Sequence, residues 1–309
     1  MAETRELILE TLRGRVLRGL QAGTLAGGER LPTSREVGAE FGADYRLVIA
    51  AYKQLELEGL VELRPRGGVY VARQPSGRQG VPPLPESWLV DVLTEGLSRE
   101  LPAPELPEWL RRSVETLRFR AAVVTTTVDQ AFGLCRELRD DFGIEAESVL
   151  ADELRGASSV PLPVRRADLI VTTEAHAGWL SALGDELKKP VIAIEVRPEL
   201  LGGEWALLLR RPVYAVVATA EFGQMLRNFF ATVPGIENLR VIVYGRDDLR
   251  DIPEDAPTYV TQRVRAQLAG VRIPGRILPA TRTISTESAR AIFSFIVHSN
   301  IEALARSRA

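Results

Sequence analysis

The sequence predicts an α/β fold in which a small, mainly helical domain with a β-hairpin precedes a larger region of alternating strands and helices. Hydrophobic residues recur at helical spacing near the N-terminus, and short β-branched runs alternate with helical patterns from Ala121 onward. Residues 75–118 between them are rich in proline. We therefore expect a domain over 1–74, a helical linker over 75–118, and an α/β region over 119–309 with lobes of about 119–198 and 212–300.

Composition excludes several classes of function. Cys135 is the only cysteine, so the chain cannot form an internal disulfide or a CxxC metal site. His176 and His298 are the only histidines and lie far apart in the sequence, which disfavours a zinc enzyme or a Ser-His-Asp triad. We expect no enzymatic activity, no metal and no cofactor.

Charge and hydropathy place the chain away from membranes. The N-terminal segment is charged and amphipathic, and no apolar run approaches the roughly 20 residues that span a bilayer, so we expect a cytoplasmic protein. The formal net charge is -2, and residues 1–80 carry 12 Arg+Lys against 10 Asp+Glu. Any binding of nucleic acid must therefore depend on where the charges lie and not on their sum.

The first 74 residues read as three helices followed by a hairpin. Thr33 is placed to cap the second helix and Glu36, three residues later, completes a capping box, while Gly42 ends that helix. Asp44 is placed to cap the third helix. The segment LVELRPRGGVYVARQ then predicts two short strands around residues 65–68. This order is typical of a winged helix-turn-helix, whose recognition helix enters the major groove of DNA.

These residues resemble the GntR family of bacterial transcription regulators. The resemblance rests on three stretches in the family's order: AGTLAGGERLPTSRE over 22–36, AAYKQLELEGLV over 50–61 and the glycine-rich RGGVYV over 66–71. It covers about a quarter of the chain and implies binding of double-stranded DNA, with Arg35 and the wing as contacts.

The recognition helix departs from the family pattern. The family usually opens this helix with Ser-Arg-x-Thr-Val-Arg, and here DYRLVI stands at residues 44–49. The usual operator sequence therefore does not carry over. The predicted DNA-binding residues are Thr33, Ser34, Arg35, Tyr45, Arg46, Arg64, Arg66, Gly67 and Gly68.

The C-terminal region has the alternation of a parallel α/β sheet. Predicted strands cover residues 121–126, 145–150, 168–173, 190–196, 214–219, 239–244, 258–260 and 275–278. The runs AVVT at 122–125 and VVAT at 216–219 each precede a helix containing Phe-Gly, which indicates two similar lobes. The pattern resembles flavodoxin-like lobes of periplasmic-binding-protein-type sensors. It does not resemble the all-helical or aminotransferase-type domains found in other GntR proteins, and the βα alternation argues against a chorismate-lyase-like sheet.

Ligands of open α/β sheets bind at the carboxyl ends of the strands, near helix N-termini. Polar side chains follow the predicted strands at these points, and arginines there can pair with a carboxylate or phosphate. Threonine before a helix is, however, most often only a cap. The candidate ligand-binding residues are Thr125, Thr126, Thr127, Thr173, Glu174, Arg197, Thr219, Glu221, Arg246 and Arg282.

The function expected from these features is a ligand-controlled, GntR-type transcription regulator that binds a palindromic operator as a homodimer. An amphipathic linker helix with Trp88, Leu89, Val92, Leu93 and Leu97 is a candidate interface, either with the DNA-binding domain or with a second subunit. Two alternatives remain: an α/β transferase or hydrolase fused to a DNA-binding module, and a regulator whose α/β region binds another protein. The effector, the operator and the choice between repression and activation are not encoded in recognisable motifs.

Overall fold

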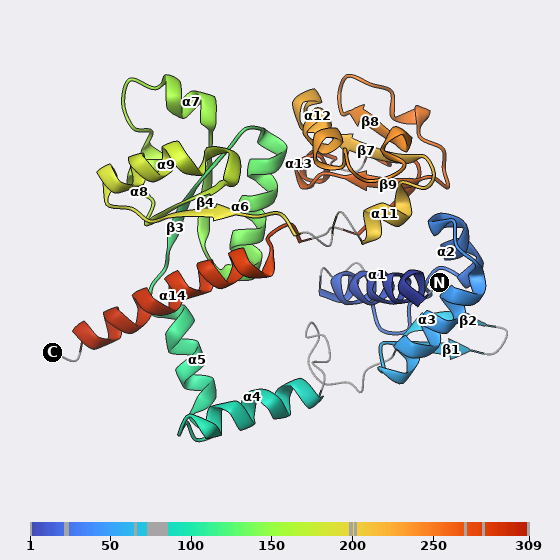
Figure 1. The fold of residues 1–309 in the computed structure, drawn as a ribbon, viewed down its shortest axis with the longest axis horizontal. Coiled ribbons are helices and arrows are strands. Elements are labelled where there is room, and N and C mark those ends of the chain that lie inside the picture. Colours follow the sequence, from blue (N-terminus) through green and yellow to red (C-terminus); the bar gives the residue numbers. More distant parts are fainter. Residues whose placement is uncertain are drawn as a thin grey trace. The chain divides into compact units, whose positions relative to one another are not determined.

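The computed structural model of the chain describes residues 2–21, 25–64, 67–72, 86–197, 200, 203–268, 271–279 and 282–307. The fold divides into two compact units (Figure 1). Unit 1 contains Met1–Pro83 and Pro198–Thr281, and unit 2 contains Leu84–Arg197 and Arg282–Ala309. Each unit therefore combines segments that are distant in the sequence.

Unit 1 begins with the predicted helices and hairpin. The elements are α1 (Ala2–Gln21), α2 (Ser34–Phe41), α3 (Tyr45–Leu57), β1 (Val61–Arg64) and β2 (Gly68–Val71). Strands β1 and β2 are antiparallel, and an isolated bridge joins Arg30 to Tyr70 at their edge. The apolar faces of α1 and α3 meet in a core that includes Ile8, Leu12, Val48 and Leu55, each at most 4% exposed. This is the winged helix-turn-helix that the sequence predicts.

The second half of unit 1 is a parallel sheet of four strands. Its elements are α11 (Glu204–Leu208), β7 (Val213–Val217), α12 (Ala220–Phe229), η1 (Ile236–Asn238), β8 (Leu239–Val243), η2 (Leu249–Asp251), β9 (Pro257–Val260), α13 (Gln262–Gln267) and β10 (Arg276–Ile277). The strand order is β8-β7-β9-β10 and every pair is parallel. Phe222 and Leu226 of α12 join Val213 and Ala215 of β7 in the same hydrophobic core as the winged helix-turn-helix.

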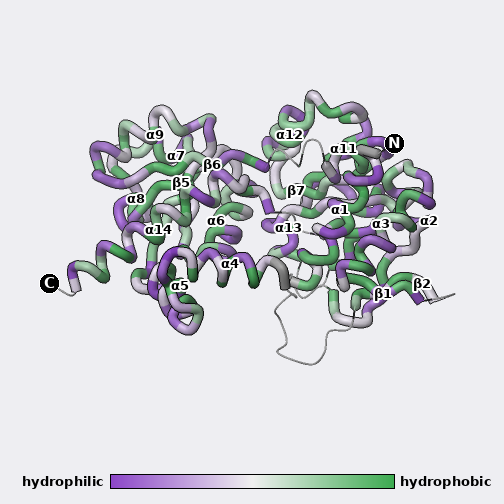
Figure 2. The backbone as a smooth tube through the Cα atoms, turned by 60° about the horizontal axis from the view of Figure 1, so that its bottom comes forward, coloured by the Kyte–Doolittle hydropathy of each residue, from purple (hydrophilic) through white to green (hydrophobic). Residues whose placement is uncertain are grey.

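Unit 2 contains a second parallel sheet of four strands. Its elements are α4 (Glu86–Ser98), α5 (Leu106–Glu115), β3 (Arg120–Thr125), α6 (Val128–Phe142), β4 (Glu145–Leu150), α7 (Ala151–Gly156), α8 (Leu162–Arg166), β5 (Leu169–Thr173), α9 (Glu174–Leu187), β6 (Val191–Ile194) and α14 (Thr286–Arg306). The order is β4-β3-β5-β6, again with parallel pairing. The hydrophobic central strands lie between helices (Figure 2).

Alternation along the strands assigns helices to the two faces of the unit 2 sheet. Ala121 and Val123 of β3 face α6 and α14, whereas Ala122 and Val124 face α7, α8 and α9. Because β3 is continued by α6 on one face and β5 by α9 on the other, the chain changes direction between these two strands. The carboxyl ends of β3 and β5 thus form a topological switch point.

The two sheets repeat one another. In each sheet, the strand that comes first in the sequence, β3 or β7, has the second strand on one side and the third and fourth strands on the other. In both, a threonine caps the helix after the first strand: Thr127 accepts from the Gln130 N–H and Thr219 from the Phe222 N–H. The similarity between residues 122–125 and 216–219 therefore corresponds to equivalent strand ends.

The final helix differs from its predicted place. The second lobe is expected to extend to about residue 300, but α14 packs against the unit 2 sheet through Ile292 and Ile296. Asn300 of α14 also accepts from the Leu117 N–H and donates to the Ser113 carbonyl, near α5. The helical periodicity is local and visible in the sequence, whereas the choice of sheet depends on contacts between residues about 180 positions apart. No helix in the described part of the chain has the length and apolar character to cross a membrane.

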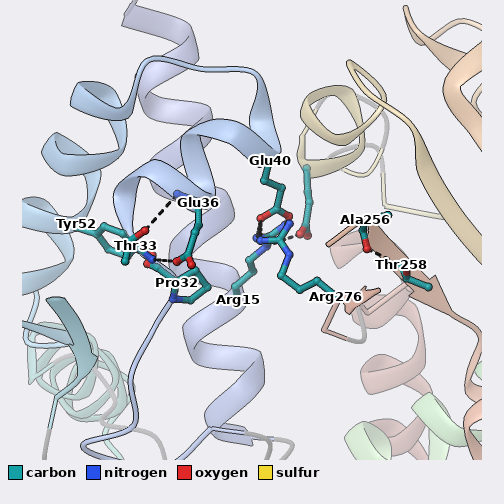
Figure 3. Close-up of polar contacts among 10 residues, drawn as sticks. Arg15, Pro32, Thr33, Glu36, Glu40, Tyr52, Ala256, Thr258 and Arg276 are labelled. Atoms are coloured by element: carbon teal, nitrogen blue, oxygen red, sulfur yellow. Dashed lines mark hydrogen bonds and ion pairs between the residues drawn. The ribbon is translucent and has the colours of Figure 1, made fainter. Parts of the chain in front are cut away.

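Replacing Tyr52 with phenylalanine tests the helix-turn-helix core. The Tyr52 side chain is 1% exposed, and its hydroxyl donates to the Pro32 carbonyl at 2.8 Å (Figure 3). We expect Tyr52→Phe to lower the free energy of unfolding by about 1 kcal/mol, because the variant loses the hydrogen bond between this buried side chain and the Pro32 carbonyl. Urea unfolding gives the measurement. Tyr45→Phe, at a side chain that is 40% exposed, is the matched control, and equal destabilisation by both changes would contradict this assignment.

Candidate functional site

Helices α2 and α3 are held by caps and by a tight turn. Thr33 accepts from the Glu36 N–H at 3.3 Å while Glu36 accepts from the Thr33 N–H at 2.6 Å, so the predicted capping box is present (Figure 3). Gly42 follows α2 with a φ of 58°, the left-handed region in which glycine is favoured. A Cβ on Gly38 would lie 2.9 Å from the Ala43 carbonyl oxygen. The turn between the helices therefore requires a residue without a side chain at position 38.

Exposed basic groups gather at the start of the recognition helix α3. The guanidinium of Arg35, from α2, lies 5.9 Å from the centroid of the Tyr45 ring, and that of Arg46 lies 6.0 Å from it. All three side chains are exposed. Asp44 caps α3 by accepting from the Arg46 N–H at 2.8 Å, so its carboxylate has a structural role. These residues, predicted separately from two helices, form one surface.

The hairpin holds its predicted residues by local contacts. The Arg64 guanidinium stacks on the Tyr70 ring at 4.1 Å and pairs with Glu62 at 2.9 Å. The Tyr70 hydroxyl donates to the Gly67 carbonyl, and Gly68 has a φ of 107°. Arg64 is thus oriented along the hairpin, next to the glycines. Arg66 lies outside the described residues.

Two exposed cations on this domain were not among the predicted contacts. Arg30 lies beside the hairpin, where its Nε is 3.4 Å from the position of a Cβ on Gly68. Lys53 is exposed on α3, two turns beyond Arg46 and on the same side by helical spacing. The position of Lys53 on this surface is predictable from the sequence, because it is seven residues from Arg46 on the same helix. The position of Arg30 is not predictable in this way, since only the fold brings it to the hairpin.

The predicted ligand-binding threonines divide into structural and available groups. Thr125 is fully buried and donates to the Thr127 carbonyl, and Thr127 and Thr219 cap α6 and α12. Thr126 is exposed at the end of β3, and its hydroxyl lies 2.9 Å from Nε2 of His176. Thr173 precedes α9 without a side-chain capping bond. Thr126 and Thr173 therefore remain candidates at the switch point of unit 2.

The charged residues predicted to bind a ligand are mostly exposed, and two of the arginines form ion pairs with aspartates. Glu174 and Glu221 lie exposed in the first turns of α9 and α12. Arg246 pairs with Asp247 at 2.9 Å, and Arg282 pairs with Asp141 of α6 at 2.6 Å. Arg197 donates its backbone N–H to the Thr283 carbonyl. Thr219, Glu221 and Arg246 lie in unit 1. The other candidate ligand-binding residues lie in unit 2: Thr125, Thr126, Thr127, Thr173, Glu174, Arg197 and Arg282.

Three buried polar atoms near the strand ends of unit 2 have no hydrogen-bond partner. They are Oε1 of Gln130, in the first turn of α6, and Nδ1 of His176 and Nε1 of Trp179, in the first two turns of α9. Burial, and secondarily the charge of Arg155, lowers the pKa of His176, so this imidazole is neutral near pH 7. The Arg155 guanidinium lies 4.7 Å from the centroid of the Trp179 ring. This end of the sheet thus offers unused hydrogen-bonding groups beside a cation.

The other chemistry-bearing residues have structural surroundings. Burial raises the pKa of the Cys135 thiol to about 11, so at neutral pH it is protonated and behaves as a small core residue. Within the described ranges, no group of three or more His, Cys, Asp or Glu side chains is arranged to hold a metal ion.

Comparison with known proteins identifies the N-terminal domain. Residues 9–71 match the family model described as bacterial regulatory proteins, gntR family. A segment of 66 residues is 38% identical to the HTH-type transcriptional regulator Rv1152 of Mycobacterium tuberculosis, and covers 21% of this chain and 54% of that protein. A segment of 56 residues is 41% identical to the Uxu operon regulator of Haemophilus influenzae, and covers 18% of this chain and 21% of that protein. The chain therefore spans about half the length of the first relative and about a fifth of the second.

One solved structure also matches part of the chain. A solved structure of a transcriptional antiterminator from Listeria monocytogenes aligns with 33% of this chain and 78% of its own, at 18% identity and a TM-score of 0.23. The identification rests on the N-terminal match and on the capped helices, glycine turn and hairpin described above: residues 9–71 are a winged helix-turn-helix domain of the gntR family of bacterial regulatory proteins.

Proposed function

We propose that this protein is a GntR-type transcription regulator that binds double-stranded DNA through α3 and the hairpin. The observation that carries the proposal is the exposed surface of Arg35, Tyr45 and Arg46 at the start of a correctly capped recognition helix. Arginine and tyrosine side chains in this position contact phosphates and base edges in the major groove. Arg30, Lys53 and Arg64 extend the basic surface on the same domain.

We propose further that the α/β region binds a small polar ligand at the switch point of unit 2. Its support is the set of unpartnered atoms on Gln130, His176 and Trp179, together with Thr126 and Thr173 at the strand ends. Each buried polar atom without a partner costs about 1–3 kcal/mol, which a hydrogen-bonding ligand offsets. We propose more specifically that the α/β region is a sensor of the periplasmic-binding-protein type. The repeated strand order of the two sheets favours this assignment.

A homodimer is the assembly that this function requires, and α4 and α5 supply a surface for it. Helix α4 exposes Trp88, Leu89, Val90, Leu93 and Leu97 by 41–66%, and α5 exposes Trp109, Leu110 and Val114 by 41–53%. Exposed apolar side chains gathered on neighbouring helices indicate an interaction surface. A two-fold contact between copies through α4 and α5 places two DNA-binding domains in the symmetry of a palindromic operator.

Arginine substitutions on the recognition surface test DNA binding. Arg35→Ala and Arg46→Ala should each reduce the slope of log affinity against log salt by about one, because each removes one phosphate contact. Fluorescence anisotropy with a labelled duplex between about 50 and 200 mM salt gives the slopes. Arg250→Ala is the matched control, since that guanidinium is exposed and paired with Asp248 at 2.7 Å on the α/β lobe of unit 1. If a variant carrying both Arg35→Ala and Arg46→Ala bound the duplex as tightly as the wild type, α3 would not be the DNA-contacting element.

An acidic substitution on α4 tests the dimer. Leu93→Glu should convert a dimer to monomers in sedimentation equilibrium, because it places a charge in the apolar contact. Leu162→Glu, on α8 of the same unit and 45% exposed against 43% for Leu93, is the control and should leave the assembly unchanged. Identical sedimentation of wild type and Leu93→Glu would remove α4 from the interface.

Native mass spectrometry of the protein purified from its own host tests ligand binding. We expect a retained small molecule with the wild type and its loss from a Thr126→Val, His176→Phe variant, since the two side chains that meet at the strand end are changed. Ser181→Ala, on the exposed side of α9, should retain the molecule. Equal retention by all three proteins places the ligand elsewhere, and an empty wild type shows that unit 2 does not hold a tightly bound metabolite.

A further inference from the structure

A cluster of buried and partly buried charges joins the helix-turn-helix to the α/β lobe of unit 1. We call it the Glu40 cluster; it comprises Arg15 and Arg18 of α1, Glu40 of α2, Glu204 of α11 and Arg276 of β10. Arg15 donates to both oxygens of Glu40, at 2.6 and 3.1 Å, and through Nε to Glu204 at 2.6 Å. Arg276 pairs with Glu40, and Figure 3 shows Arg15 and Arg276 converging on that carboxylate.

The carboxylate of Glu40 has almost no access to water. Its side chain is 1% exposed, and those of Arg15 and Glu204 are each 12% exposed. The Arg15 guanidinium also lies 4.8 Å from the centroid of the Phe41 ring. Although burial opposes its charge, Glu204 and Glu40 raise the pKa of Arg15, so the cation is retained. A buried charge that loses a partner is strongly destabilised, so these groups fix one another in place.

Helix α11 extends the contact with apolar side chains. Leu207 and Leu208 are fully buried in the core that also contains Ile8, Leu12 and Val16 of α1. Trp205 stacks on Phe230, at the end of α12, with centroids 4.6 Å apart, and makes an edge contact with Tyr259 of β9 at 5.5 Å. One short helix thus packs against both α1 and the sheet.

The contact reaches the turn before the recognition helix. Glu40 is in the last turn of α2, and a Cβ on Gly42 would lie 3.8 Å from Arg210, just beyond α11. On the other side, Arg276 belongs to β10, an edge strand that pairs with β9 through only two residue pairs. A short edge strand is held by few hydrogen bonds and moves at low cost. The cluster therefore connects a weakly held strand to the end of α2.

We propose that the Glu40 cluster and α11 dock the DNA-binding domain on the α/β lobe of unit 1, so that this lobe sets the position of α2 and α3. A displacement of β10 or α11 is then transmitted to α2 through the Arg276–Glu40 and Arg15–Glu204 pairs. This regulatory meaning rests on the proposed DNA-binding function, whereas the docking itself does not. The route runs through side-chain contacts within unit 1 and does not require the residue 75–118 linker.

Hydrogen exchange of the full-length chain tests the docking. We expect the amides of α2, over Ser34–Phe41, to exchange about tenfold faster in both Arg276→Gln and Glu204→Gln than in the wild type, because each change removes one of the ion pairs that hold the buried Glu40 or Arg15. The amides of β3 and β5 in unit 2 should exchange as in the wild type. Arg250→Gln, which removes an exposed and paired arginine from the same lobe, should leave α2 unchanged.

A double-mutant cycle separates docking from general loss of stability. The unfolding effects of Glu40→Gln and Arg276→Gln should be non-additive, with the double variant more stable than the sum of the single effects predicts. Arg276→Lys, which keeps the charge, should restore most of the α2 protection and decides the outcome if Arg276→Gln unfolds. Wild-type exchange of α2 in both single variants, or strict additivity in the cycle, would overturn the proposal. A wild type that failed to bind duplex DNA would refute the proposed function and leave the exchange result standing.

Discussion

The position of the recognition helix depends on one buried carboxylate. Glu40 lies at the end of α2, two residues before the glycine that starts the turn into α3, and it is ion-paired from α1 by Arg15 and from β10 by Arg276. Taking a carboxylate out of water costs several kcal/mol, and only its partners offset that cost. Arg15, Glu40 and Arg276 must therefore be in place together, which makes the DNA-binding domain and its neighbouring sheet one folding unit.

The same dependence appears in how the two sheets are covered. In unit 2, α6 and α14 cover one face of the sheet through Leu134, Leu138, Ile292 and Ile296. In unit 1, α12 covers part of the equivalent face, and α11 with the winged helix-turn-helix joins it in one core. The equivalent faces of the two sheets are thus packed against different elements: α6 and α14 in unit 2, and α12, α11 and the winged helix-turn-helix in unit 1. This difference explains why a chain with two similar lobes divides into units that do not follow its sequence order.

Local features of the fold were predictable, and long-range pairings were not. The eight strands of the sheets lie within two residues of their predicted starts, since alternating β-branched residues and threonine caps are short-range signals. The capping box at Thr33 and Glu36 was predictable for the same reason. The packing of α14 and the pairing of Glu40 with Arg276 depend on contacts between distant segments, which a single sequence does not reveal. Among the site residues, the threonines show this limit: Thr127 is a cap, whereas Thr126, its neighbour, faces His176.

The departure of α3 from the usual family pattern has a physical rationale in its cap. An aspartate at the start of a recognition helix repels phosphate, but Asp44 accepts a hydrogen bond from the Arg46 N–H, so its carboxylate satisfies the helix end and lies in the favourable field of the helix dipole. Arg35 and Arg46 flank Tyr45 beside it and return positive charge to the same surface. The Tyr45 ring lies within 6.0 Å of both guanidinium groups, a distance at which a cation and an aromatic face attract one another. Capping and positive charge are thus divided between adjacent residues at the start of α3.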